Sequence, residues 1–249
     1  MKIAMAVLFA LGILSYGCSK KKSALSPYVL NMEVFGAKVV DSTAIPPEIK
    51  YEGNIVVAIE WQDKLGKNLF IGSLTGEKTG IIIDSLYRDG FELSDRKLYC
   101  YHFVSNSLKP NWEIKKDENC VYDLGVNFIE KTISVTDLDK DSIGEVSFAY
   151  YSACRSDVSP SDVEVILEEN KVFYKLSGIG LLPHGRKNKD EILDKEDICC
   201  LDKVGEKDFD NQLGKYKDEV SFVNAPPSFL DFAQSVWVSA IHNEYNYLK

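Results

Sequence analysis

The class of the fold is decided by one stretch, Val163-Glu164-Val165-Ile166-Leu167-Glu168-Glu169-Asn170-Lys171-Val172-Phe173-Tyr174-Lys175-Leu176. Two runs rich in β-branched and aromatic residues flank the polar triplet Glu168-Glu169-Asn170. Such runs around a short polar break are typical of two strands joined by a turn. The stretch therefore predicts an antiparallel β-hairpin.

The same pattern continues towards the N-terminus. Residues 55–61 and 68–74 are apolar runs around a polar turn at 62–67, and they predict another hairpin. Residues 98–104 are apolar almost throughout, as expected for a strand that is covered on both faces. Thirteen Tyr and twelve Phe also favour strands. We expect a mainly β fold, an antiparallel sheet assembly, with further strands at 81–83, 112–115, 121–129, 131–135 and 145–151.

The C-terminal part has a different period. Its apolar residues fall at helical spacing, and Ser228 with Asp231 can cap a helix start. We predict an amphipathic helix over about 228–247 that packs on the sheet, after a charged helical or irregular region at 183–218. The apolar stripe consists of Phe229, Phe232, Ala233, Val236, Trp237, Ala240 and Ile241.

The N-terminus has the features of an export signal. Lys2 precedes an uncharged apolar run that is too short to span a bilayer, and small residues follow it. Ser15-Tyr16-Gly17-Cys18 resembles a bacterial lipobox, although Leu14 lies one place early and Tyr16 is bulky. We predict a signal peptide at 1–17, acylation of Cys18 (palmitate is one expected chain) and a polar tether at 18–27. An ordinary signal peptide with a stray cysteine is the alternative.

The remaining chain, residues 28–249, is expected to form a single β-rich domain, because no strong boundary interrupts it. Its composition argues against one class of partner. The formal net charge is −9 and no basic patch is present, so we expect no nucleic-acid binding. The predicted partner is the membrane, reached through the N-terminal lipid.

Cysteine usage fits an oxidising compartment. Acylation of Cys18 would leave five of six cysteines, an odd number that cannot all pair within the chain. A ring between the neighbours Cys199 and Cys200 would be strained, and one of them could meet Cys100 instead. The pairing of these three stays open, and the absence of CxxC spacing favours structural cysteines over a zinc or redox site.

One loop carries the spacing of a cation site. Residues 137–145 read Asp-Leu-Asp-Lys-Asp-Ser-Ile-Gly-Glu, with carboxylates at positions 1, 3, 5 and 9 between two predicted strands. Ca²⁺ suits such a loop because it takes six to eight oxygen ligands in flexible geometry. An acidic hairpin loop exposed to water is the alternative. The predicted ligands are the side chains of Asp137, Asp139 and Asp141, the Ile143 carbonyl, and Glu145 directly or through water.

The loop is not an EF-hand, because Phe148 occupies position 12 and strands flank it. It resembles the calcium loops of FG-GAP repeats, which occur in β-propellers, but with Ser142 in place of the expected Gly. A bound ion would hold the loop in one conformation and does not by itself imply catalysis.

Four blocks resemble a family of flavobacterial exported proteins named for surface polysaccharide biosynthesis. They are residues 60–68, 136–141, the block Cys154-Arg155-Ser156-Asp157-Val158-Ser159-Pro160-Ser161, and the late Phe229, Phe232, Ala233 and Trp237. The resemblance spans about residues 55–240. It implies a link to lipopolysaccharide or capsule, and a disulfide between Cys120 and Cys154. It implies no reaction and no catalytic residue.

Active-site signals are sparse. The sequence contains no HExxH, GxSxG or GxGxxG motif, and His102 is expected to be a core residue. No catalytic residue is predicted. Arg155, Asp157 and Ser159 are candidates for a polar binding loop.

These observations lead to one expected function and two alternatives. We expect a lipid-anchored envelope protein of a Gram-negative outer membrane, which binds glycan or an envelope assembly protein without catalysis. The alternatives are an exported carbohydrate-active enzyme with paired carboxylates and a purely structural envelope lipoprotein.

Overall fold

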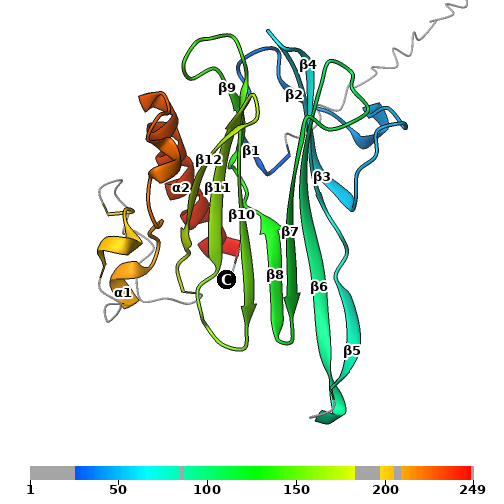
Figure 1. The fold of residues 1–249 in the computed structure, drawn as a ribbon, viewed down its shortest axis with the longest axis vertical. Helices are drawn as coiled ribbons and strands as arrows, with labels where there is room; N and C mark the ends of the chain where they lie inside the picture. Colours follow the sequence, from blue (N-terminus) through cyan, green and yellow to red (C-terminus); the bar gives the residue numbers. More distant parts are fainter. Residues whose placement is uncertain (1–25, 85–86, 183–196, 205–208, 248–249) are drawn as a thin grey trace, which may run out of the picture.

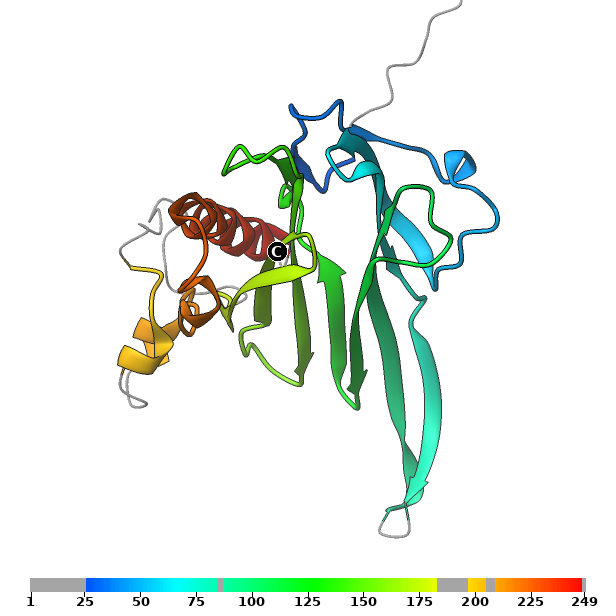
Figure 2. The ribbon, with the colours of Figure 1, turned by 45° about the horizontal axis from the view of Figure 1, so that its top comes forward.

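The computed structural model describes residues 26–84, 87–182, 197–204 and 209–247 of the 249-residue chain. Two six-stranded sheets pack face to face, and the helix α2 (Pro227–Tyr247) covers the outer face of one of them (Figures 1 and 2). The expected mainly β fold with a C-terminal helix is confirmed. The predicted signal peptide, Cys18 and most of the tether lie outside the described residues.

The first sheet, sheet A, has the order β1-β9-β10-β11-β12, and β8 also pairs with β10. Every pair is antiparallel except β1 with β9. Its strands are β1 (Val29–Asn31), β8 (Asp123–Phe128), β9 (Ile133–Thr136), β10 (Glu145–Arg155), β11 (Asp162–Glu169) and β12 (Val172–Ile179).

The second sheet, sheet B, has the order β2-β3-β4-β6-β5, and β7 pairs with β6. The far ends of β5 and β6 extend beyond the body as a two-stranded arm (Figure 2). The strands are β2 (Lys38–Val39), β3 (Asn54–Asp63), β4 (Gly66–Leu74), β5 (Lys78–Asp84), β6 (Tyr87–Val104) and β7 (Trp112–Cys120).

Strand β10 contributes to two cores. Phe148 and Tyr150 face sheet B, whereas Ala149 and Tyr151 face α2. A strand buried on both faces needs an apolar residue at nearly every position, which explains its uninterrupted sequence. A third core covers the outer face of sheet B, where Ile45 and Ile49 pack on β3, β4 and β6.

Both predicted hairpins are present, as β3–β4 and β11–β12. Asn170 and Lys171 turn the second hairpin with φ of 47° and 72°, so both glutamates of the polar triplet belong to β11. Strand β6 is longer than predicted because its first part pairs only with β5 in the arm. The two stacked sheets are not a propeller.

The charged region after β12 contains short elements where it is described. They are the 3₁₀ helices η2 (Leu201–Lys203) and η3 (Val220–Phe222) and the helix α1 (Phe209–Gln212). A further 3₁₀ turn, η1 (Ser42–Ala44), precedes β3.

Helix α2 begins one residue before the predicted cap. Pro227 is its first residue, so the prediction of Ser228 as the cap is wrong. Proline suits the first helical position because the N–H that it lacks would have no partner within the helix. The predicted stripe faces sheet A, and Trp237 Nε1 donates to the Gly214 carbonyl at 2.8 Å. Within the described residues no helix combines the length and the apolar character needed to span a bilayer.

Two disulfides lie within the described residues. Cys120 at the end of β7 is bonded to Cys154 on β10, as the resemblance implied, and this bond ties sheet B to sheet A. Cys199 is bonded to its neighbour Cys200, which answers the question that the sequence left open. Cys100 is the one free cysteine in the described part of the chain; it is fully buried, and burial raises the pKa of its thiol.

Candidate metal centre

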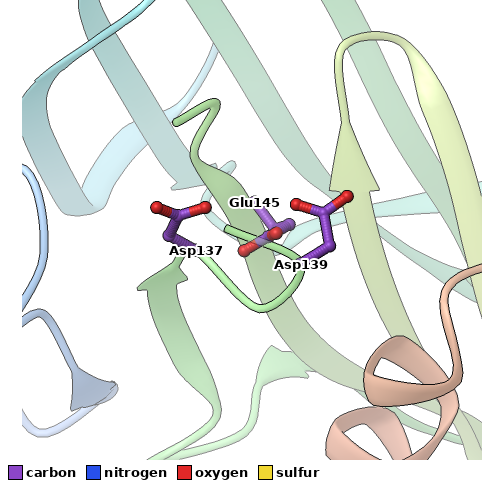
Figure 3. Close-up of side chains that lie close together, drawn as sticks. All are labelled: Asp137, Asp139 and Glu145. Atoms are coloured by element: carbon purple, nitrogen blue, oxygen red, sulfur yellow. The ribbon is translucent and has the colours of Figure 1, made fainter. Parts of the chain in front are cut away.

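The acidic loop joins β9 to β10 at one end of the sandwich (Figure 3). Asp137 and Asp139 lie on the loop, and Glu145 is the first residue of β10. Glu145 is fully buried, whereas Asp139 and Asp141 are exposed. The carboxylates of the loop therefore range from fully buried to exposed.

Backbone hydrogen bonds hold these carboxylates in place. Asp139 Oδ1 accepts from Asp141 N at 3.1 Å, and Asp141 Oδ1 accepts from Ile143 N at 2.7 Å. Asp137 Oδ1 accepts from Ser142 N at 3.3 Å. One oxygen of each aspartate is thus used to shape the loop, and the other is available to a cation.

Two overlapping groups of carboxylates could hold a metal ion. In each group the ligand atoms lie within 4.8 Å of one another. One group is Asp137, Asp139 and Glu145, and the other is Asp139, Asp141 and Glu169. The structure thus brings together all four predicted side-chain ligands and adds Glu169 from the end of β11.

The spacing within the loop does not predict Glu169, because this residue belongs to the polar triplet expected to form the turn of a separate hairpin. Residues 139 and 169 are far apart in the chain, and only the pairing of β10 with β11 brings the turn beside the loop. No local motif predicts that approach.

Two carboxyl groups at the loop, those of Glu145 and Glu169, have raised pKa values. Burial raises the pKa of Glu145 to about 7, and the negative charge of Asp139 adds to the effect. Burial also raises the pKa of Glu169 to about 7, with contributions from the charges of Asp139 and Asp141. Burial and the neighbouring carboxylates thus both disfavour the ionised forms. A bound cation would supply it.

The turn between β3 and β4 supports the loop from the other sheet. Asp63 Oδ2 accepts from Gly144 N and from Trp61 Nε1, both at 2.9 Å. Lys64 N donates to the Ser142 carbonyl at 2.9 Å. A Cβ at Gly144 would lie 2.6 Å from Trp61 Nε1, so glycine is required for this close approach. The block 60–68 of the family resemblance therefore contacts the part of the loop that directly follows the block 136–141.

The donor set fits a hard cation, because it consists of oxygen atoms alone. Both Glu145 oxygens accept from Leu138 N, at 2.9 and 3.0 Å, so this carboxylate also closes the base of the loop. Ile143 lies in the same loop, and ligation by its carbonyl stays a prediction.

The other candidate residues form a separate turn between β10 and β11. Arg155 Nη1 donates to the Ser159 carbonyl at 2.6 Å, and Asp157 Oδ1 accepts from Ser159 N at 2.9 Å and from its hydroxyl. These hydrogen bonds lower the pKa of Asp157. The three predicted binding-loop residues therefore lie together, with their polar groups largely engaged by one another.

His102 is a core residue, as predicted. It is 2% exposed, stacks on Trp61 with ring centroids 5.1 Å apart, and Nε2 lies 3.0 Å from Asn68 Oδ1. Its Nδ1 lies 3.6 Å from Oε2 of Glu168, which is fully buried. This contact joins the two sheets in the interior.

Comparisons with known proteins found no match to this chain. No family model matches it, and neither a curated protein nor a solved structure does.

Proposed function

We propose that this protein is an envelope lipoprotein whose β-sandwich is stabilised by Ca²⁺ and binds glycan or an assembly partner in surface-polysaccharide biosynthesis. The proposal rests on the acidic loop together with the predicted export signal. The loop belongs to sheet A and is hydrogen-bonded to the β3–β4 turn of sheet B, so an ion bound there would stabilise the contact between the two sheets. In this proposal the loop has a structural role, because its carboxylates hold backbone N–H groups in place.

Export is supported by the disulfides. Stable disulfides are typical of oxidising compartments, and the Cys120–Cys154 bond ties the two sheets together. The predicted signal peptide at 1–17 and the acylation of Cys18 would anchor the folded domain to a membrane that faces such a compartment. Extracellular Ca²⁺ modules need only weak affinity, with dissociation constants on the order of 10⁻⁴–10⁻³ M.

The Ca²⁺ proposal is tested with Asp139→Ala, because Asp139 belongs to both carboxylate groups. At a Ca²⁺ concentration about ten times the dissociation constant, the ion would add about 1.4 kcal/mol to the free energy of unfolding. This corresponds to a rise in melting temperature of roughly 3–6 °C for a domain of this size. Differential scanning calorimetry of the wild type should show the rise and its loss with chelator.

The Asp139→Ala variant should show no Ca²⁺-dependent rise. Asp202→Ala is the matched control, because Asp202 is an exposed aspartate in η2 outside the loop. If Asp139→Ala responds to Ca²⁺ as the wild type does, the loop is not the site.

The envelope role is tested by three measurements. Mass spectrometry of the natural protein should find a lipid on residue 18 as the first residue. A glycan array probed with the full-length protein in mild detergent should show binding to surface polysaccharide. An intact Met1 without lipid would contradict the anchoring, and a deletion strain with unchanged lipopolysaccharide and capsule would contradict the link to polysaccharide.

A further inference from the structure

The two-stranded arm of sheet B extends beyond the strands that flank it (Figures 1 and 2). Strand β7 pairs with β6 only from Ser94 onward, and β4 pairs with β6 only from Leu98 onward. The arm therefore consists of residues 78–84 of β5 and residues 87–93 of β6, paired with each other alone. Two-stranded ribbons are only marginally stable in water, so a further strand at one edge would stabilise the arm.

The middle of β5 exposes isoleucine on both faces of the arm. Ile81 is 76% exposed and Ile82 is 40% exposed. Successive side chains of a strand point to opposite faces, so these two residues lie on different faces. Each face therefore presents apolar surface to water, and its burial against another strand would be favourable.

The outer edge of β5 is suited to pairing with another strand. β5 is the last strand of sheet B, and no described strand pairs with its outer edge. Proline and charged residues protect the edge strands of many proteins, and residues 79–83 contain neither. The irregularity of the arm lies in β6, which has three residues between the pairs 82–91 and 84–87 where β5 has one. Strand β5 therefore keeps a regular edge.

The other edge of the arm, on β6, is less suited to pairing. Gly90 has a φ of 67°, so the backbone departs from the extended conformation there. The sequence of this part of β6 also contains the charged residues Arg88, Asp89 and Glu92. Bulges and charges of this kind disfavour the addition of a strand.

The sequence of β5 is complementary to itself. It reads Lys78-Thr79-Gly80-Ile81-Ile82-Ile83-Asp84, with opposite charges at its two ends. In an antiparallel pair of identical strands related by a two-fold axis, the central residue faces its own copy. With Ile81 at the centre, Lys78 of each copy faces position 84 of the other, where the sequence has aspartate. Opposite charges that face each other across two strands stabilise the pair. Registers centred on Gly80 or Ile82 lose both charge pairs.

The same register fits the sizes of the side chains. Ile82 of one copy would face Gly80 of the other, and a Cβ at Gly80 would meet nothing within 4 Å. The space beside Gly80 is therefore open to a large side chain. On the opposite face the two Ile81 side chains would meet, so apolar surface would be removed from water on both faces of the arm.

We propose that two copies of this protein associate through their arms, with the two β5 strands paired antiparallel about Ile81. The joined arms form a four-stranded sheet, and three or more strands are what a sheet needs for independent stability. Antiparallel pairing places the two bodies at opposite ends of the joined arms, so they do not compete for the same space (Figure 2). The contact is small, so the dimer is a transient one. It goes beyond the proposed function and depends on neither Ca²⁺ nor polysaccharide.

Sedimentation velocity of the full-length protein, in mild detergent with micelles in excess over protein, tests the association. The protein should be monomeric at about 1 μM and increasingly dimeric towards about 500 μM. Lys78→Glu should weaken dimerisation at least about fivefold, because two symmetry-related pairs of opposite charges become pairs of like charges. Asp84→Lys should act in the same way. The matched control is Lys109→Glu, at an exposed lysine outside the arm, which should dimerise as the wild type does.

The double variant tests the register. Lys78→Glu combined with Asp84→Lys again places opposite charges across the two strands, so dimerisation should return to within about twofold of the wild type. A double variant that dimerises as weakly as either single variant overturns the proposal, as does a wild type that is monomeric at every concentration.

Cross-linking locates the contact. Directly opposed residues of an antiparallel pair have Cβ atoms about 4.5–5.5 Å apart, so Ile81→Cys should cross-link to its own copy with a short bismaleimide. Val220→Cys is the control, because Val220 in η3 is 72% exposed and lies outside the arm. It should stay mostly monomeric, and equal yields from the two variants would overturn the proposal.

Ile81→Lys separates association from folding. It should abolish the dimer, because two like charges would face each other, and it should melt as the wild type does, because the position is exposed. If it fails to fold, the charge-reversal variants decide. A lipid surface is the other possible occupant of the arm. A blue shift of bimane attached at Ile81→Cys in phosphatidylethanolamine–phosphatidylglycerol vesicles, together with monomeric protein, would assign the arm to lipid and overturn the dimer.

Discussion

Ser142 occupies the sixth position of the acidic loop with a φ of 71°, in the left-handed region that favours glycine. Its contacts here are made by the backbone, since its N–H donates to Asp137 and its carbonyl accepts from Lys64. The departure from the FG-GAP pattern at this residue is therefore a local strain in an otherwise well-bonded loop.

Replacing Ser142 with Gly should relieve that strain. A left-handed conformation costs a non-glycine residue about 1–2 kcal/mol. Glycine avoids this cost, but it loses more conformational entropy on folding, which lowers the stability by about 0.5–1 kcal/mol. We expect Ser142→Gly to raise the free energy of unfolding by about 0.5 kcal/mol and to tighten Ca²⁺ binding, as measured by denaturant titration and calorimetry. Ser142→Ala keeps the Cβ and should bring no gain; a gain of equal size would show that the hydroxyl, not the backbone, is responsible.

At the scale of single elements, α2 depends on Trp237. This side chain is fully buried, donates to the Gly214 carbonyl and meets the Tyr216 ring edge-on at 5.5 Å. The helix also carries Gln234, whose side-chain amide donates to the Tyr216 hydroxyl, and Asn243, whose side-chain amide donates to the Glu130 carbonyl.

Trp237→Ala should therefore cost about 3–5 kcal/mol of stability, the usual loss for a large buried aromatic side chain. Chemical denaturation measures the change. Ser235→Ala, on the exposed side of the same helix, should stay within about 0.5 kcal/mol of the wild type. Equal effects of the two changes would mean that α2 is not docked as described.

The disulfide between β7 and β10 acts on two elements at once. Cys120 and Cys154 are 34 residues apart, and closing a loop of that length restricts the unfolded chain by about 3–4 kcal/mol. The double variant Cys120→Ser with Cys154→Ser should lower the melting temperature by roughly 10 °C in calorimetry. Serine at both Cys199 and Cys200 should have a much smaller effect, because a link between neighbours closes almost no loop.

For the whole molecule, three glutamates with raised pKa values set the dependence of stability on pH. The pKa values of Glu145, Glu169 and Glu244 are raised from near 4.5 to about 7, in each case chiefly by burial. Between these pH values the folded protein binds more protons than the unfolded chain. The contribution of these groups to stability is therefore greatest below about pH 4.5 and is lost as the pH rises to about 7.

We expect the free energy of unfolding, measured with chelator present, to fall from about pH 4.5 to about pH 7. Saturating Ca²⁺ should reduce this fall, because the ion favours the ionised forms of Glu145 and Glu169. Glu244 lies outside the acidic loop, so Glu244→Gln should reduce the fall with or without Ca²⁺. Identical pH profiles with and without the ion would contradict the metal centre.

The sequence by itself determined the features that depend on neighbouring residues. The alternation around Glu168-Glu169-Asn170, the run at 98–104 and the stripe from Phe229 to Ile241 predicted the strands and the helix, because strand and helix periods are local. The spacing of Asp137, Asp139 and Asp141 predicted the acidic loop for the same reason.

Only the tertiary structure decided which distant residues meet. It brought Glu169 to Asp139, Asp63 to Gly144, and the end of α2 to β8, and it paired Cys199 with Cys200. The first three contacts depend on strand register and on how the layers pack, which are set by the burial of many side chains at once. No local pattern encodes such approaches, so the additional metal ligand becomes visible only in the folded chain.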